Sequence, residues 1–273
     1  MNGHQTGTVL ITGATSGLGR YLTTELYRRG WAVHAHGRSQ VRLADLASEL
    51  PGIRTWQADL AALADVRRLA REISGQVDQL NVLVNNAAIG FGLPGGARQA
   101  SADGCELRMA VNYLAPVLLT RRLLPLLMRS APAAIVQVGS IGQVDFAVDD
   151  IQFRSGYNGV QAYRRSKLAL VTHTFDLARD LDGSGVVVNC VHPAGFMDTG
   201  MVRESGIRPL STVAQGGHAV LMLITDPALA ALNGQFFDGV DISAARPLAY
   251  DARFQRDLRV ATDSLLGHGR TPA

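Results

Sequence analysis

One stretch near the N-terminus decides the fold: Thr8-Val9-Leu10-Ile11-Thr12-Gly13-Ala14-Thr15-Ser16-Gly17-Leu18-Gly19. Its apolar run, residues 9–11, is typical of a buried parallel strand. The chain then turns through glycines and enters a periodic segment, residues 21–29, that predicts a helix ending at Gly30. A glycine-rich turn between strand and helix lets backbone amides approach a phosphate, and the helix N-terminus adds a favourable dipole. The spacing G-x-x-x-G-x-G therefore favours a dinucleotide-binding turn over an ordinary strand–helix turn.

The rest of the chain repeats this alternation of strand and helix. Further strands are predicted at residues 31–36, 53–58, 80–84, 134–138, 186–191 and about 235–237. Helices are predicted at residues 41–50, 65–77, 109–128, 163–182 and 212–224, with a kink near Pro116. A loop is expected at 196–211 and a polar tail from about 249 to 273. Without a linker, a repeat or a break in composition, the pattern predicts a single α/β domain over 1–273, a doubly wound parallel sheet.

Composition excludes several classes of protein. The net charge is +3 and the arginines form no long run, so nucleic-acid binding has little support. Cys105 and Cys190 offer no disulfide framework, and the seven histidines lack metal-ligand spacing, so no metal is expected. The polar start of the chain resembles no signal peptide, and no apolar run is long enough for a membrane span. A cytoplasmic location is therefore the expectation.

Polar or small residues follow several of the predicted strands, where ligands of such sheets bind. Arg38 follows the second strand, where its guanidinium could bond a 2′-phosphate and so favour NADP(H) over NAD(H). The alternative is a solvated loop residue. Asp59 follows the third strand and could accept from an adenine amino group, cap the next helix, or both. Asn85-Asn86-Ala87 follows the fourth strand, where small residues could pass beside a flat ligand or form a structural turn.

Three side chains carry the candidate chemistry. Tyr163 and Lys167 lie four residues apart on a predicted helix and so share a face. A nearby ammonium is expected to lower the pKa of the tyrosine, which makes the phenol a usable acid/base. Ser140, at the end of the fifth strand, could donate a hydrogen bond to the same substrate oxygen. This set matches what hydride transfer to a carbonyl requires, whereas a surface Tyr–Lys pair is the alternative for the helix alone.

These motifs, in this order, resemble the single-domain short-chain dehydrogenase/reductase family over nearly the whole chain. The matching positions are Thr12-Gly13-x-x-x-Gly17-x-Gly19, Asp59, Asn85-Asn86-Ala87, Asn112, Ser140, Tyr163-x-x-x-Lys167 and the Pro193 region. The resemblance implies a Rossmann-type fold, with Tyr163 as general acid/base and Ser140 orienting the substrate. It also implies that Lys167 contacts the nicotinamide ribose and that Asn112 holds a water relaying protons from Lys167. Thr199, one residue further on than in the usual pattern, is the expected contact to the nicotinamide carboxamide.

The expected site can then be stated in full. The catalytic residues are Asn112, Ser140, Tyr163 and Lys167. The NADP(H)-binding residues are Gly13, Thr15, Ser16, Gly17, Leu18, Gly19, Arg38, Asp59, Leu60, Asn86, Ala87, Tyr163, Lys167, Pro193 and Thr199. The reaction expected from this set is hydride transfer between NADP(H) and a small-molecule carbonyl or alcohol.

The spacing of Ser140 and Tyr163 bears on the substrate. They are 23 positions apart, and this length is similar to the retinol-dehydrogenase-like branch, as is Tyr157-Asn158-Gly159. That similarity implies a bulky apolar substrate, walled by residues 141–153 and roofed by 196–211. The family also implies a homodimer or homotetramer through the helices at 109–128 and 163–182. Two rival functions are a non-catalytic NADP-binding sensor or scaffold, and an epimerase or dehydratase of a nucleotide-linked sugar.

Overall fold

A single sheet with helices on both faces forms the molecule. The computed structural model describes residues 6–93 and 95–267. Its strands are β1 (Thr8–Ile11), β2 (Ala32–Gly37), β3 (Arg54–Gln57), β4 (Val82–Asn85), β5 (Ala133–Val138), β6 (Val186–His192), β7 (Phe236–Asp238) and β8 (Asp241–Ser243). Their order in the sheet is β3-β2-β1-β4-β5-β6-β7-β8, and every neighbouring pair is parallel except β7 with β8. The predicted doubly wound single-domain α/β fold is confirmed.

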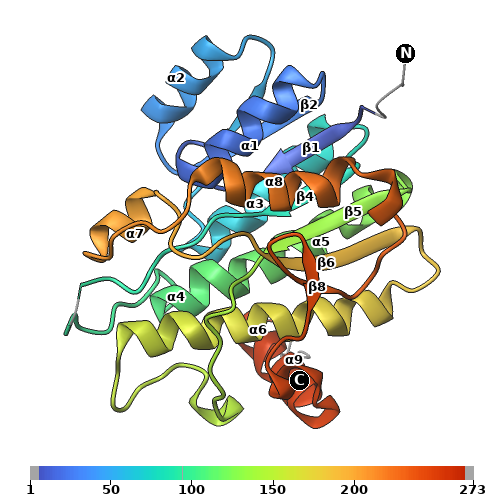
Figure 1. Ribbon diagram of the computed structural model, residues 1–273. Coiled ribbons are helices and arrows are strands. Elements are labelled where there is room, and N and C mark those ends of the chain that lie inside the picture. Colours follow the sequence, from blue (N-terminus) through green and yellow to red (C-terminus); the bar gives the residue numbers. More distant parts are fainter. Residues whose placement is uncertain (1–5, 94, 268–273) are drawn as a thin grey trace.

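The helices divide between the two faces of the sheet (Figure 1). They are α1 (Gly17–Arg28), α2 (Gln40–Glu49), α3 (Leu63–Gln76), α4 (Leu107–Met109), the π-helix η1 (Ala110–Leu114), α5 (Ala115–Arg129), α6 (Gly159–Asp180), α7 (Gly200–Glu204), α8 (Val213–Thr225) and α9 (Ala252–Leu265). Short 3₁₀ turns are η2 (Val148–Asp150), η3 (Pro227–Leu229) and η4 (Pro247–Tyr250). One apolar cluster joins the sheet to α1 and α8, and a second joins the opposite face to α3, α5 and α6.

The predicted helix over 109–128 is wrong in two respects. It begins earlier, at Leu107, and it is interrupted by the π-helix η1, which ends two residues before Pro116. Proline has no N–H for the carbonyl of Asn112, four residues earlier, and its ring would collide with that carbonyl in a regular helix. The wider π-turn accommodates this conflict, so the irregularity expected at Pro116 lies over the five residues that include Asn112.

The expected polar tail from 249 is also wrong within the described residues. Residues 247–250 form η4, and α9 follows as a regular helix. Its buried positions recur every four residues, at Phe254, Leu258, Thr262 and Leu266, which places them on one face. Phe254 packs edge-to-face on Phe146, with ring centroids 5.3 Å apart. The part of the tail beyond 267, and residues 1–5 at the polar start of the chain, lie outside the described residues.

The long helix α6 is enclosed by its own chain. Every residue from Ser166 to Ala178 is buried, because β5 and β6 cover one side and α9 and η4 another (Figure 1). Ion pairs from Arg259 of α9 to Asp176 and Asp180 of α6 add to this packing. The face expected to pair two copies through this helix is therefore covered, and the homo-oligomer stays a prediction.

No helix of the described part of the chain has the length and apolar character needed to cross a membrane.

Candidate active site

The glycine turn between β1 and α1 has a backbone that few other residues could adopt. Gly13 and Gly17 have φ of 69° and 50°, the left-handed region that favours glycine. Gly19 has a different constraint, since a methyl group there would lie 2.2 Å from the Gly13 carbonyl oxygen and 2.5 Å from Asn86 Nδ2. The turn is therefore folded tightly back against the end of β4.

Hydrogen bonds tie this turn to the end of β4. Thr12 Oγ1 accepts from the amides of Asn86 and Ala87, both at 3.0 Å. The Asn86 side chain donates to the Thr12 carbonyl at 2.8 Å. Asn86 and Ala87 thus shape the turn in this structure, and their expected role beside the cofactor is a prediction that the contacts leave open.

His36 is a residue of this site that the sequence reasoning missed. Its Nδ1 accepts from the Gly13 amide at 3.3 Å, and its Nε2 lies 3.2 Å from the Ala58 carbonyl oxygen. Burial lowers the pKa of His36 to about 4, so the ring is neutral near pH 7 with the proton on Nε2. The available signal was the pair of polar residues, His34 and His36, inside the second strand. His36 joins the glycine turn to the ends of β2 and β3.

The start of α1 has its backbone donors open. Its N-cap residue, Ser16, makes no side-chain capping bond, and the first turn, which includes Leu18, holds no acidic residue. Thr15 precedes the cap and packs against Gly37, where a methyl group would lie 2.7 Å from Thr15 Cγ2. An uncapped helix start without a carboxylate is suited to an anion such as a pyrophosphate.

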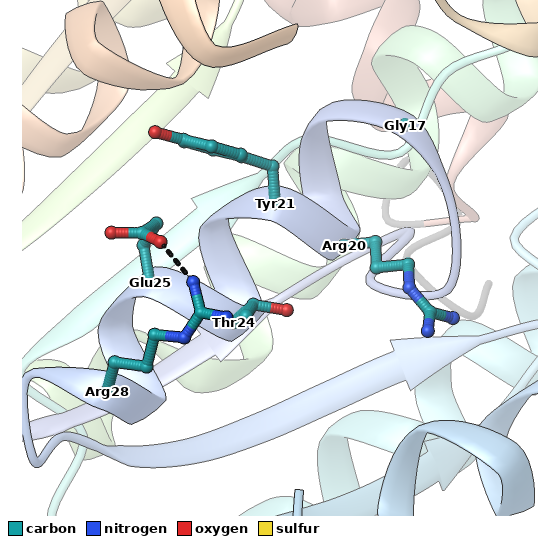
Figure 2. Close-up of a pocket in the computed structure, with 6 residues that line it drawn as sticks. All are labelled: Gly17, Arg20, Tyr21, Thr24, Glu25 and Arg28. Atoms are coloured by element: carbon teal, nitrogen blue, oxygen red, sulfur yellow. Dashed lines mark hydrogen bonds and ion pairs between the residues drawn. The ribbon is translucent and has the colours of Figure 1, made fainter. Parts of the chain in front are cut away.

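A shallow groove of about 300 Å³ runs along the outer face of α1 from Gly17 to Arg28 (Figure 2). Arg20, Tyr21, Thr24 and Glu25 also line it, and Arg28 donates to Glu25 at 2.9 Å. Tyr21 packs against Gly217 of α8, since a methyl group there would lie 2.2 Å from the tyrosine ring. Gly17 is the only residue that this groove shares with the expected cofactor-binding set.

The ends of β2 and β3 carry the two residues expected near the adenosine. Arg38 is exposed, and no carboxylate among residues 6–93 and 95–267 forms an ion pair with its guanidinium. Asp59 Oδ1 accepts from the Ala61 amide at 2.9 Å, which closes a turn before α3. The N-cap of α3 is Ala62, so the helix-capping role weighed for Asp59 is wrong. Leu60 beside it is buried, with 6% of its surface exposed. Contact of these residues with an adenine or its ribose stays a prediction.

Ser140 and Tyr163 converge on one point from different elements. Ser140 follows β5, and Tyr163 lies in the first turns of α6. A methyl group on Gly142 would lie 3.2 Å from Ser140 Oγ and 4.0 Å from Cε1 of Tyr163. The Ser140 hydroxyl accepts from the Gly142 amide at 2.9 Å, which orients its own proton away from that amide. A substrate oxygen in this position could meet both hydroxyl groups.

The pKa of Tyr163 differs from the expectation. Burial raises the pKa of the phenol, and a hydrogen bond with Ser140 opposes that rise. The lowering expected from Lys167 is wrong here, because the ammonium is directed elsewhere. Lys167 Nζ donates to the Val138 carbonyl at 2.8 Å and lies 5.7 Å from the centroid of the Tyr163 ring. Burial lowers the pKa of Lys167 to about 8, so its charge titrates near neutral pH.

Asn112 acts as a clamp between two segments. Its Oδ1 accepts from the Ile89 amide at 2.8 Å, and its Nδ2 donates to the Ile89 carbonyl at 3.0 Å. Nδ2 also donates to Ser166 Oγ at 3.1 Å, one residue before Lys167. The side chain thus holds the loop after β4 against α6, and the expected water relay stays a prediction.

The expected loop at 196–211 contains the helix α7, whose N-cap is Thr199. A methyl group on Gly17 would lie 3.2 Å from Thr199 Cγ2, so the segment reaches the glycine turn. Met201 packs on Gly90 at its other side, where a methyl group would lie 2.7 Å from Met201 Cγ. Pro193 is buried before this segment and packs on Gly216 of α8. The segment therefore spans from the glycine turn to the loop after β4.

Replacing Gly19 by Ala is expected to weaken binding of the cofactor predicted from the sequence, NADPH, by about a hundredfold. The methyl group would displace either the Gly13 carbonyl or Asn86, and a misplacement of about 1 Å in a binding element costs on that order. Isothermal titration with NADPH measures the effect. Gly75→Ala is the matched control, because Gly75 has open space around it near the end of α3 and should leave the affinity unchanged. Equal affinities for the two variants would contradict the prediction.

A protein-family model described as "short chain dehydrogenase" matches residues 7–208. Human retinol dehydrogenase 13 is 33% identical over 287 residues, which cover 95% of this chain and 84% of the relative.

Solved structures with the same architecture include an uncharacterized protein from Mycobacterium paratuberculosis, with a TM-score of 0.79 and 27% identity over 96% of this chain and 94% of the other. Another is the NADP active-site complex of Pseudomonas aeruginosa RhlG, with a TM-score of 0.71 and 26% identity, covering 87% and 97% of the two chains.

Proposed function

Since the chain belongs to the short-chain dehydrogenase family and is an oxidoreductase, we propose that it transfers a hydride between NADP(H) and the carbonyl or alcohol carbon of a bulky apolar substrate. One observation carries the proposal above the others. Ser140 and Tyr163, from β5 and α6, approach the same point beside Gly142, with Lys167 buried one turn further along α6.

The residues present fit a dinucleotide phosphate. The uncapped start of α1 offers amide donors, and the glycine turn keeps side chains out of their way. Arg38, exposed and without an ion-pair partner among the described residues, suits a 2′-phosphate. NADP in the active-site complex of RhlG supports NADP over NAD. The residues that would hold the cofactor are Gly13, Thr15, Ser16, Gly17, Leu18, Gly19, Arg38, Asp59, Leu60, Asn86, Ala87, Tyr163, Lys167, Pro193 and Thr199.

The side chains would then divide the proton chemistry. A bound nicotinamide supplies or accepts the hydride. Tyr163 Oη donates a proton to the substrate oxygen in reduction and takes it back in oxidation. Ser140 Oγ donates a hydrogen bond to the same oxygen and stabilises the charge that develops there. Lys167, whose pKa of about 8 lets it gain and lose a proton near neutrality, would restore the proton of Tyr163 and exchange its own protons with solvent by way of a water held near Asn112.

The rim of the proposed cleft supports an apolar substrate. Large apolar side chains are exposed in the loops after the strands: Leu93, Ile141, Phe196 and Leu210. Phe91 adds an aromatic ring that meets the Tyr163 ring edge-to-face. The relative named retinol dehydrogenase is consistent with a polycyclic or long-chain carbonyl. The wall formed by residues 141–153 is fastened by Arg165, which pairs with Asp150 and lies 3.7 Å from the Phe153 ring centroid.

The test is consumption of NADPH in the presence of a panel of carbonyls that runs from small aldehydes to long-chain and polycyclic ketones. The loss of reduced-nicotinamide absorbance should be fastest with the bulky apolar members. Tight NADPH binding without consumption would support the sensor or scaffold instead. Consumption with small polar carbonyls alone would contradict the substrate class but leave the reaction intact.

A further inference from the structure

A buried charged cluster lies beside the proposed site, outside the residues that would contact substrate or cofactor. Glu106 and Arg108 have only 1% and 5% of their surfaces exposed, and their closest charged atoms are 3.4 Å apart. The hydroxyl of Tyr157 joins them, since it accepts from Arg108 Nη1 at 2.7 Å and donates to Glu106 Oε1 at 2.9 Å. A buried ion pair is weak support for stability, so a cluster of this kind calls for another role.

Arg108 also donates hydrogen bonds to the loop after β4. Its Nε donates to the Gly90 carbonyl at 2.9 Å, and its Nη2 donates to the Phe91 carbonyl at 2.7 Å. The planar guanidinium thus fixes two consecutive backbone carbonyls at once, which the single ammonium of a lysine could not do with the same geometry. The loop it holds is rich in glycine and would otherwise have many accessible backbone conformations.

The same cluster also fixes the start of α6. Glu106 Oε2 caps α4 by accepting from the Met109 amide at 2.7 Å, while Tyr157 lies two residues before α6. Gly159, the first residue of α6, touches the carbonyl held by Arg108, since a methyl group there would lie 2.1 Å from the Phe91 oxygen. Three segments distant in sequence therefore meet at this guanidinium.

Phe91 links the loop held by Arg108 to Tyr163. Its ring stands edge-to-face on the Tyr163 ring, with centroids 5.1 Å apart and an interplanar angle of 84°. Such a contact has a preferred direction as well as area. The orientation of the Tyr163 ring therefore depends on where the Phe91 backbone lies and on the first turn of α6.

We propose that Glu106, Arg108 and Tyr157 form a positioning cluster that sets the Tyr163 ring through Phe91 and the first turn of α6. The proposal rests on the proposed function in assigning Tyr163 the proton transfer. None of the three residues need touch substrate or cofactor. Their effect should fall on kcat and on the titration of Tyr163, with the KM for NADPH left unchanged.

Tyr157→Phe is the mildest test, because it removes one hydroxyl and keeps the ring against Phe153. We expect kcat to fall about tenfold, and about a hundredfold in Arg108→Met, since a misplacement of about 1 Å at a reacting group costs on that order. Arg108→Lys, which keeps the charge and one donor, should recover part of the loss. Tyr113→Phe and Arg121→Met are matched controls, whose partners Thr262 and Asp263 belong to α9.

A second readout needs no turnover. The absorbance titration of each protein, minus that of its Tyr163→Phe counterpart, gives the pKa of the Tyr163 phenol. Burial raises that pKa, so loosening Phe91 should let water in and move it back toward the ordinary value. If Arg108→Met fails to fold, Tyr157→Phe decides. A folded Tyr157→Phe protein with the parent kcat and the parent Tyr163 pKa overturns the positioning proposal. A parent enzyme that consumes no NADPH instead contradicts the proposed function, and the titration of Tyr163 then decides the positioning proposal alone.

Discussion

Tyr163→Phe is expected to lower kcat by about a thousandfold while NADPH still binds. The ring would keep its contact with Phe91, so the local packing survives and only the proton donor is lost. A positioned general acid contributes a factor of about 10² to 10⁴ in rate. In the variant Ser140 could still stabilise the charge that develops on the substrate oxygen, but it would not supply the proton that Tyr163 donates. Steady-state consumption of NADPH measures kcat, and isothermal titration measures binding.

The control for this prediction is Tyr113→Phe. Tyr113 is also buried, and its hydroxyl shares a hydrogen bond of 2.7 Å with Thr262, at the far side of α6 from Ser140. Its loss should lower the free energy of unfolding by about 1 kcal/mol and leave kcat unchanged. Substantial turnover by Tyr163→Phe would remove the tyrosine from the acid role, whatever the control does.

Arg38→Asp should exchange the cofactor preference. The change removes a cation that could bond the 2′-phosphate and places a carboxylate where it can accept from the ribose hydroxyls of NADH. Hydrogen bonds to charged groups contribute about 1.5–3 kcal/mol, so we expect the KM for NADPH to rise about a hundredfold and that for NADH to fall. The ratio of kcat/KM for the two cofactors is the measurement.

Arg71→Asp provides the same change in net charge on the exposed surface of α3. It should leave the ratio unchanged, which separates a local effect at the end of β2 from a general effect of charge on nucleotide binding. An unaltered KM for NADPH in Arg38→Asp would place the phosphate elsewhere.

The parts of the fold that could be predicted are those with strong local patterns. Most of the strands β1 to β7 are short apolar runs between turns, as buried parallel strands are, and each begins or ends within a few residues of its predicted bounds. The strand β3, with the sequence Arg-Thr-Trp-Gln, is the exception, since only its tryptophan is buried. The strand β8 has three residues, too few for a pattern. The helix α9 has a clear four-residue repeat from Phe254 to Leu266, but its charged outer face hides the repeat in a polar composition.

The candidate active site also has features that local sequence patterns predict and features that they do not. Glycine spacing and the Tyr163–Lys167 pair are local, so the sequence alone could indicate them. His36 and Arg108 act across 23 and 18 residues, on Gly13 and Gly90, and no local pattern announces such partners. The pKa of Tyr163 depends on how deeply its phenol is buried and on which carbonyl accepts the hydrogen bond from Lys167. Both are determined only when the chain is folded.

The π-turn before Pro116 has a consequence for how this helix could change. A π-turn closes its hydrogen bonds five residues apart instead of four, so Ala110–Leu114 holds one residue more than a regular turn needs. Deleting a single residue there would restore an ordinary turn and leave the segment on its N-terminal side in nearly the same phase relative to α5, because the wider turn and the regular turn each complete about one revolution. Glu106 and Arg108 would then keep their direction toward Tyr157 and Phe91, whereas the bulge that carries Asn112 would be lost, so the extra residue shapes the Asn112 contacts with Ile89 and Ser166 and not the angle between α4 and α5.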